Sequence, residues 1–152
     1  MKKNERHTIE YPRSIIAQIA RIREAGNFFV VKELQERGLT GIVPAHGAVL
    51  HFLFRQQEPV PIGSLVEQTG RVKSTVTGVV NTLERHGYLF RLGCDQDARC
   101  VRIGLTDKGL ALQNDFEAIS EKLLDRVFGD MPARDRQRLM ELLAVVEGNL
   151  KR

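Results

Sequence analysis

The chain has 152 residues, of which 42% are hydrophobic and 28% are charged. This length supports one hydrophobic core, and this composition excludes an intrinsically disordered chain. The longest apolar stretch, 41–54, is shorter than the roughly 18 residues that span a bilayer and is interrupted by Pro44, His46 and His51. No hydrophobic segment follows the basic N-terminus. We therefore expect a soluble, cytoplasmic protein with no membrane partner.

The formal net charge of +4 is concentrated in the middle of the chain. Between Arg71 and Arg102 there are six basic and three acidic residues, whereas from Asp107 onward there are eight basic and nine acidic residues. A basic segment between nearly neutral flanks favours a polyanion as partner, although an ordinary solvated surface would give the same count.

The first part of the chain predicts helices. Apolar residues recur with a period near 3.6 over residues 1–40, with a possible break at Gly26-Asn27 and a stop at Gly38. A second helix is expected from Pro44 to about Gln57, where the proline-containing turn 58–61 ends it.

Two helices separated by a short turn are expected next, over residues 63–69 and 73–86. The second of them has an apolar side, formed by Val76, Val79, Val80 and Leu83. Its other side carries short or hydrogen-bonding residues, namely Ser74, Thr77, Gly78, Asn81 and Arg85. Such a side suits a helix that lies in a DNA groove and contacts base edges.

The apolar period then changes from 3.6 to 2. Residues 88–92 predict a strand, 93–98 a turn rich in Gly and Asp, and 99–105 a returning strand. A β-hairpin that directly follows a helix–turn–helix is the element order of a winged helix.

The C-terminal part predicts a long helix capped by Thr106 and ending at Gly129, and a last helix that opens at Asp130 and Pro132. Together with the N-terminal helix, these helices carry more apolar surface than one small domain needs to cover. They therefore indicate a subunit interface, the alternative being that they complete the core of a monomer.

The segment 61–109 resembles the MarR family of bacterial transcriptional regulators. The matching residues are those of the second helix, its exit, the hairpin and the following cap, namely Thr75-Val76-Thr77, Leu83-Glu84-Arg85 with Gly87, Arg91 with Asp97 and Arg99, and Leu105-Thr106 with Gly109. The resemblance implies a mainly α fold with a small β-hairpin wing, and a single MarR-like domain over 1–152. In that fold, helices in 1–40 and 110–152 form a homodimer, and 44–109 is the winged helix–turn–helix, with recognition helix 73–86 and wing 88–105.

The resemblance also implies a dimeric, sequence-specific regulator that binds an inverted-repeat operator in double-stranded DNA. The candidate DNA-binding residues are Arg71, Lys73, Ser74, Thr75, Thr77, Gly78, Asn81, Arg85, Arg91, Asp97 and Arg99. By chemistry, Asn81 can read adenine through two hydrogen bonds, while arginine and lysine suit phosphates. Arg99 is expected at the wing tip, oriented by Asp97, for which Arg91 is the alternative partner. Ser74 and Thr75 could instead cap their helix.

Members of the family commonly bind a small aromatic or amphipathic ligand between the dimer helices and the winged helix. The resemblance therefore implies a repressor that such a ligand releases. The candidate ligand-binding residues, each of which would also suit the core, are Tyr11, Phe28, Phe29, His46, His51 and Phe52.

The sequence also bears on regulation by redox or by a metal, and on two functions other than DNA binding. Cys94 and Cys100 flank the wing turn and could form a redox switch. Neither these cysteines nor the four histidines have metal-ligand spacing, so no metal or other cofactor is expected. No catalytic motif is present, so we do not expect the protein to be an enzyme. The remaining alternative is a winged helix that binds protein and not DNA.

Overall fold

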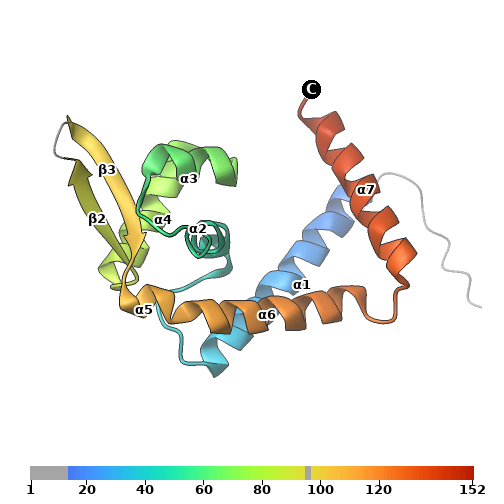
Figure 1. The fold of residues 1–152 in the computed structure, drawn as a ribbon. Helices are drawn as coiled ribbons and strands as arrows, with labels where there is room; N and C mark the ends of the chain where they lie inside the picture. Colours follow the sequence, from blue (N-terminus) through green and yellow to red (C-terminus); the bar gives the residue numbers. More distant parts are fainter. Residues whose placement is uncertain (1–13, 95–96) are drawn as a thin grey trace, which may run out of the picture.

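The computed structural model describes residues 14–94 and 97–152, with side chains described for 14–93 and 101–152. Figure 1 shows two parts. The winged-helix body comprises residues 44–110, and the arm consists of the helices before and after it. Among the described residues, no helix is sufficiently long and apolar to cross a membrane.

The first helix of the arm, α1, is continuous over Ile15–Glu36. The expected break at Gly26-Asn27 is wrong, because an isolated glycine costs a helix only about 1 kcal/mol and still donates its hydrogen bond. The helix ends where Gly38 adopts a left-handed conformation, with φ +68°. A 3-10 turn, η1 (Pro44–His46), then leads into α2 (Gly47–Leu53). The latter ends before the expected Gln57, in turns that direct the chain towards the sheet.

The helix–turn–helix consists of α3 (Ile62–Thr69) and α4 (Lys73–Arg85), within a residue of the predicted bounds. Gly70 ends α3 in a left-handed conformation, with φ +61°. The predicted apolar side of α4 is buried through Val76, Val79, Val80 and Leu83. The polar side therefore faces away from the core.

The sheet has three antiparallel strands in the order β1-β3-β2. The wing is formed by β2 (Leu89–Cys94) and β3 (Asp97–Leu105), which extend into the predicted turn 93–98. A third strand, β1 (Val60–Pro61), pairs with β3 at Ile103 and Arg102. The sequence did not predict β1, because two residues that end in proline are typical of a turn, and proline is tolerated only at a sheet edge.

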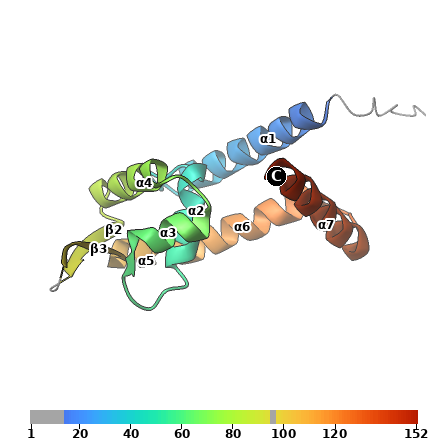
Figure 2. The same cartoon turned by 90° about the horizontal axis from the view of Figure 1, so that it is seen from above.

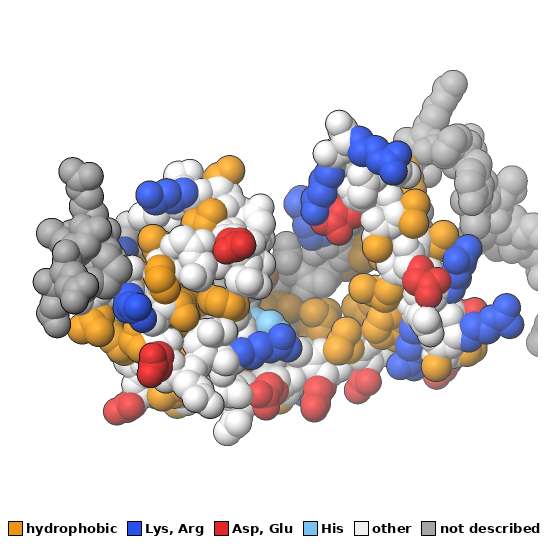
Figure 3. Space-filling view, turned by 45° about the horizontal axis from the view of Figure 1, so that its top comes forward, with side chains coloured by type: hydrophobic (Ala, Val, Ile, Leu, Met, Phe, Trp, Pro, Cys, Tyr) orange, Lys and Arg blue, Asp and Glu red, His pale blue; other side chains and the backbone are white. Residues whose placement is uncertain are grey.

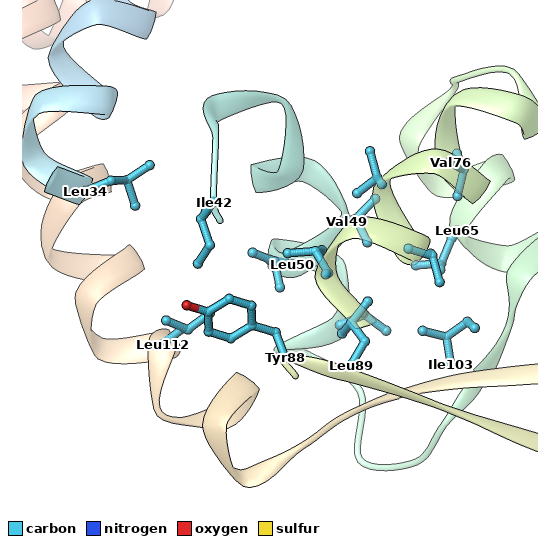
Figure 4. Close-up of a cluster of buried hydrophobic side chains, with 14 of the residues drawn as sticks. Leu34, Ile42, Val49, Leu50, Leu65, Val76, Tyr88, Leu89, Ile103 and Leu112 are labelled. Atoms are coloured by element: carbon cyan, nitrogen blue, oxygen red, sulfur yellow. The ribbon is translucent and has the colours of Figure 1, made fainter. Parts of the chain in front are cut away.

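One hydrophobic core joins the body to the arm (Figure 4). Its fully buried side chains come from α2, α3, α4 and β3, namely Val49, Leu50, Leu65, Val76, Val80, Leu83 and Ile103. Tyr88, which is 3% exposed, extends this core toward Leu112 and Leu34, and its hydroxyl donates to the carbonyl oxygen of Thr40 at 2.9 Å. The body is thereby fixed to the loop that follows α1.

The C-terminal segment begins as predicted, with the Thr106 side chain accepting a hydrogen bond from the backbone N–H of Gly109 at 3.1 Å. The long helix expected to follow is interrupted at Ala111, which separates α5 (Asp107–Leu110) from α6 (Leu112–Phe128). The last helix, α7 (Ala133–Leu150), has no buried residue. In Figure 1, α6 runs from the body to the far end of the arm, where α7 turns back from it.

Candidate nucleic-acid interface

The outer side of α4 presents the residues predicted to contact DNA. Figure 2 shows α4 along one side of the body, with β2 and β3 extending beside it. Lys73, Ser74 and Thr75 are exposed in the first turn, and Gly78 and Asn81 are exposed further along the helix. The half-buried Thr77 donates its hydroxyl proton to the carbonyl oxygen of Lys73 at 2.9 Å.

Neither Ser74 nor Thr75 caps α4. The N-cap position is occupied by Val72, which forms no side-chain capping bond. Val72 is 68% exposed, so the apolar side chain at the start of α4 also faces solvent. The hydroxyl groups of Ser74 and Thr75 thus lie in the first turn without the structural role that the sequence left open for them.

Arg91 of the wing is bound to α4. Its Nη1 lies 2.9 Å from Oε2 of Glu84, and its Nη2 donates to Oδ1 of Asn81 at 2.5 Å. The structure pairs Arg91 with Glu84. This contact ties β2 to the outer side of α4. The alternative pairing of Arg91 with Asp97 stays a prediction, because the Asp97 side chain lies outside the described ones.

The other basic candidates differ in how firmly hydrogen bonds to the rest of the protein hold their side chains. Arg71 is half-buried, and its Nη1 donates to the carbonyl oxygen of Ala45 at 2.8 Å, which connects the turn before α4 to η1. Arg85 is exposed and only approaches the hydroxyl of Thr82, at 3.4 Å. Lys73 and Arg85 are therefore the more accessible cations near the two ends of α4.

The remaining candidates of the wing lie outside the described side chains. Cys94 and Asp97 are paired in the hairpin, and Arg99 and Cys100 belong to β3. Because side chains are described only up to residue 93 and again from 101, the Asp97–Arg99 pair and the redox role of Cys94 and Cys100 stay predictions.

A cavity of about 340 Å³ lies between α1, the start of α2 and α6. It combines polar groups of α1, Arg23 and Asn27, with apolar side chains that include Val30, Leu34, Pro44, Phe116 and Ile119. A second hollow, of about 610 Å³, is lined by His51 of α2, by Arg55 after the end of α2 and by residues of α6. Figure 3 shows the depression between body and arm, with hydrophobic side chains along its floor.

Of the ligand candidates, only His51 lines either of these hollows. Phe28 is 75% exposed, Phe29 packs against the Arg126 guanidinium, and Phe52 packs on the core. Tyr11 lies outside the described residues. The sequence reasoning missed Arg23, Asn27 and Phe116. The sequence pattern that could have indicated this cavity is a pair of polar residues four positions apart, Arg23 and Asn27, on an otherwise apolar side of the first helix.

His46 has a structural role. It is 7% exposed, and its Nδ1 accepts a hydrogen bond from the backbone N–H of Val43 at 3.4 Å. Burial lowers the pKa of His46, and the nearby His86 and Arg71 lower it further. Within the described side chains, no three His, Cys, Asp or Glu residues gather in a way that could hold a metal ion.

The fold and this surface define a winged helix–turn–helix protein. Residues 46–101 match the model of the MarR family. The resemblance to the MarR family is thus confirmed, and the winged-helix segment is a MarR family domain.

Solved structures share this fold over nearly the whole chain. A MarR transcriptional regulator from Methanosarcina mazei Go1 is 25% identical, with a TM-score of 0.74 over 92% of this chain and 99% of that one. The MepR–DNA complex of S. aureus is 20% identical, with a TM-score of 0.80 over 89% and 97%. BpsR of Bordetella bronchiseptica, whose DNA binding is regulated by 6-hydroxynicotinic acid, is 22% identical, with a TM-score of 0.75 over 90% and 96%.

Proposed function

We propose that this protein is a dimeric, sequence-specific DNA-binding transcriptional regulator that acts as a repressor. The observation that carries the proposal is the exposed side of α4, which has hydrogen-bonding residues between the accessible cations Lys73 and Arg85. In a winged helix, the second helix of the motif enters the major groove and its N-terminal residues contact base edges. The MarR family domain and the S. aureus complex with DNA support the same role.

The arm supports dimerisation. Large apolar side chains are exposed on all three of its helices, including Ile15, Ile16, Ile19 and Ile22 on α1, Leu124 and Val127 on α6, and Met140, Leu142, Leu143, Val145 and Leu150 on α7. A second copy of the chain would bury them. Two copies related by a two-fold axis would place their α4 helices about 34–36 Å apart, which suits an inverted-repeat operator.

The cavity between α1, α2 and α6 supports release by a small aromatic or amphipathic anion. Arg23 and Asn27 would bind its polar group, while Val30, Leu34 and Phe116 would contact its apolar part. A ligand changes DNA affinity only if it binds the DNA-competent and incompetent conformations differently. This cavity lies where α1 and α6 of the arm meet α2 of the body, so its occupancy would affect their relative position.

Fluorescence anisotropy tests the proposal. The purified protein is titrated into the duplex that flanks its own gene and into a scrambled duplex, at three salt concentrations, with and without reductant. Sequence-selective binding that weakens steeply with salt is expected, because several phosphates are neutralised in each half-site. Absence of binding to both duplexes at low salt would overturn the proposal in favour of a protein-binding winged helix. A loss of binding on oxidation would favour the switch through Cys94 and Cys100.

A further inference from the structure

Arg91 contacts α4 at two points, and this fixes the orientation of the Asn81 side chain. Arginine has only hydrogen-bond donors, so the amide atom of Asn81 that faces Arg91 must be the oxygen. The amide nitrogen, with its two N–H donors, is therefore directed away from the guanidinium. Glu84 holds the other nitrogen of the same guanidinium at 2.9 Å, so Arg91 cannot turn freely about the contact with Asn81.

Asn81 lies on the exposed side of α4, on which Ser74, Thr75 and Gly78 also lie. Reading adenine through two hydrogen bonds requires the amide oxygen to accept from N6 while the amide nitrogen donates to N7. In this protein, the oxygen already accepts from Arg91 on the side of the wing. The amide nitrogen has no part in this contact, so the donor is the group of Asn81 that a base can bind without competing with Arg91.

We propose that Arg91 is a positioning residue that makes Asn81 a hydrogen-bond donor to DNA, so that Asn81 selects a guanine or a thymine and not the adenine expected from the sequence. This inference rests on the proposed function. In the major groove, guanine offers the acceptors O6 and N7 and thymine offers O4, whereas cytosine offers only a donor. Adenine has an acceptor at N7, but its N6 amino group would have to share the amide oxygen of Asn81 with the cationic donor Arg91.

The same contacts give Arg91 a role different from that of a phosphate-binding arginine. Both of its terminal nitrogens are bound by α4, and its side chain is 35% exposed. Arg85, which lies at the end of the same helix, is exposed, and among the described side chains it has only the long contact with Thr82. Arg85 is thus the matched control, because it carries the same charge without touching Asn81.

The experiment is selection of operators from a duplex library with wild type, Asn81→Ala, Asn81→Asp, Arg91→Ala and Arg85→Ala, followed by affinity measurements on single-base variants. The operator position at which the Asn81→Ala variant no longer prefers one base is the position that Asn81 contacts. At this position, wild type is expected to select guanine or thymine. Arg91→Ala frees the amide oxygen and is expected to shift the preference there to adenine, with other positions unchanged.

Asn81→Asp provides a second test that keeps Arg91 in place. An aspartate still accepts from Arg91 but has no N–H to donate, so we expect the preference to move to cytosine and the affinity for the wild-type operator to fall about tenfold. Arg85→Ala is expected to weaken binding to all sequences equally. Thermal unfolding of each variant checks that it is folded.

Two results would overturn the inference while leaving the proposed function intact. One is a wild-type preference for adenine at the position of Asn81. The other is a folded Arg91→Ala variant that binds more weakly but keeps every wild-type base preference. If wild type selects no sequence at all, the proposed function fails, and the inference falls with it.

Discussion

The carboxylate of Glu33 in α1 accepts a hydrogen bond from Nζ of Lys122 in α6 at 2.9 Å. Glu33 is 8% exposed, and the same oxygen also lies 3.3 Å from Nη2 of Arg37. Arg37 in turn reaches Asp115 of α6 at 3.6 Å. These contacts join α1 to α6 beside the core, and the hydrogen bond from Lys122 is the main cause that lowers the pKa of Glu33.

Glu33→Gln should lower the midpoint of thermal unfolding by a few degrees, because it leaves Lys122 and Arg37 without their shared carboxylate. Since the pKa of Glu33 is lowered on folding, its contribution is complete above the ordinary value of 4.5 and is lost as the pH falls through the lowered pKa. The difference between variant and wild type should therefore shrink in acid. Glu36→Gln removes only the exposed pair with Lys32 and should change the midpoint little. Equal effects of the two substitutions would contradict this account.

His46 should make the protein less stable below neutral pH. Its pKa is lowered on folding, so the unfolded chain binds more protons between the lowered pKa and the ordinary value of 6.5. Stability should thus fall as the pH decreases below about 6.5, by at most about 1.4 kcal/mol per pH unit for one histidine. Urea unfolding of wild type and His46→Gln between pH 5 and 8 measures this slope. The exposed His51→Gln is the control and should retain the wild-type slope.

Two glycines should respond oppositely to alanine. A Cβ at Gly109 would overlap the carbonyl oxygen of Tyr88, so Gly109→Ala should destabilise the protein by about 1–3 kcal/mol. A Cβ at Gly78 would meet nothing within 4 Å, and this residue lies inside α4, so Gly78→Ala should stabilise by about 0.5–1 kcal/mol. Urea unfolding measures both. A stabilised Gly109→Ala would show that the turn between Tyr88 and α5 is not closely packed.

Lys73→Ala should weaken binding to operator and scrambled duplex alike. An exposed lysine that contacts a phosphate contributes a sequence-independent term, so its removal should reduce the slope of log affinity against log salt by about 1. Anisotropy titrations at several salt concentrations give this slope. A change in selectivity with an unaltered slope would instead place Lys73 on a base edge.

Leu142→Asp should separate the proposed dimer. Leu142 is 47% exposed on α7, which has no buried residue, so the substitution should not disturb the core of the protomer. Sedimentation velocity is expected to show a monomer at concentrations at which wild type is dimeric, with a steep loss of operator affinity. Glu147→Gln, an exposed change on the same helix, is the control. A Leu142→Asp protein that stays dimeric would exclude this face of α7 from the interface.

The helix–turn–helix and the wing could be predicted from local patterns in the amino-acid sequence. The bounds of α3 and α4 follow from local signals, namely apolar residues with a period of 3.6 and glycines that stop each helix. The change of period after Gly87 likewise predicted β2 and β3. These elements could be predicted because each depends on residues close together in the chain.

The features that join distant segments depend on how the helices and strands pack against one another. β1 exists because Val60 and Pro61 meet Ile103 and Arg102 across the sheet, although their local sequence is typical of a turn. Arg91 is paired with Glu84 and Asn81 of α4, since the packing of β2 against α4 brings them together. The cavity lined by Arg23 and Phe116 depends in the same way on the crossing of α1 and α6. Periodicity reports which side of a helix is buried, but it does not report which other helix lies against it.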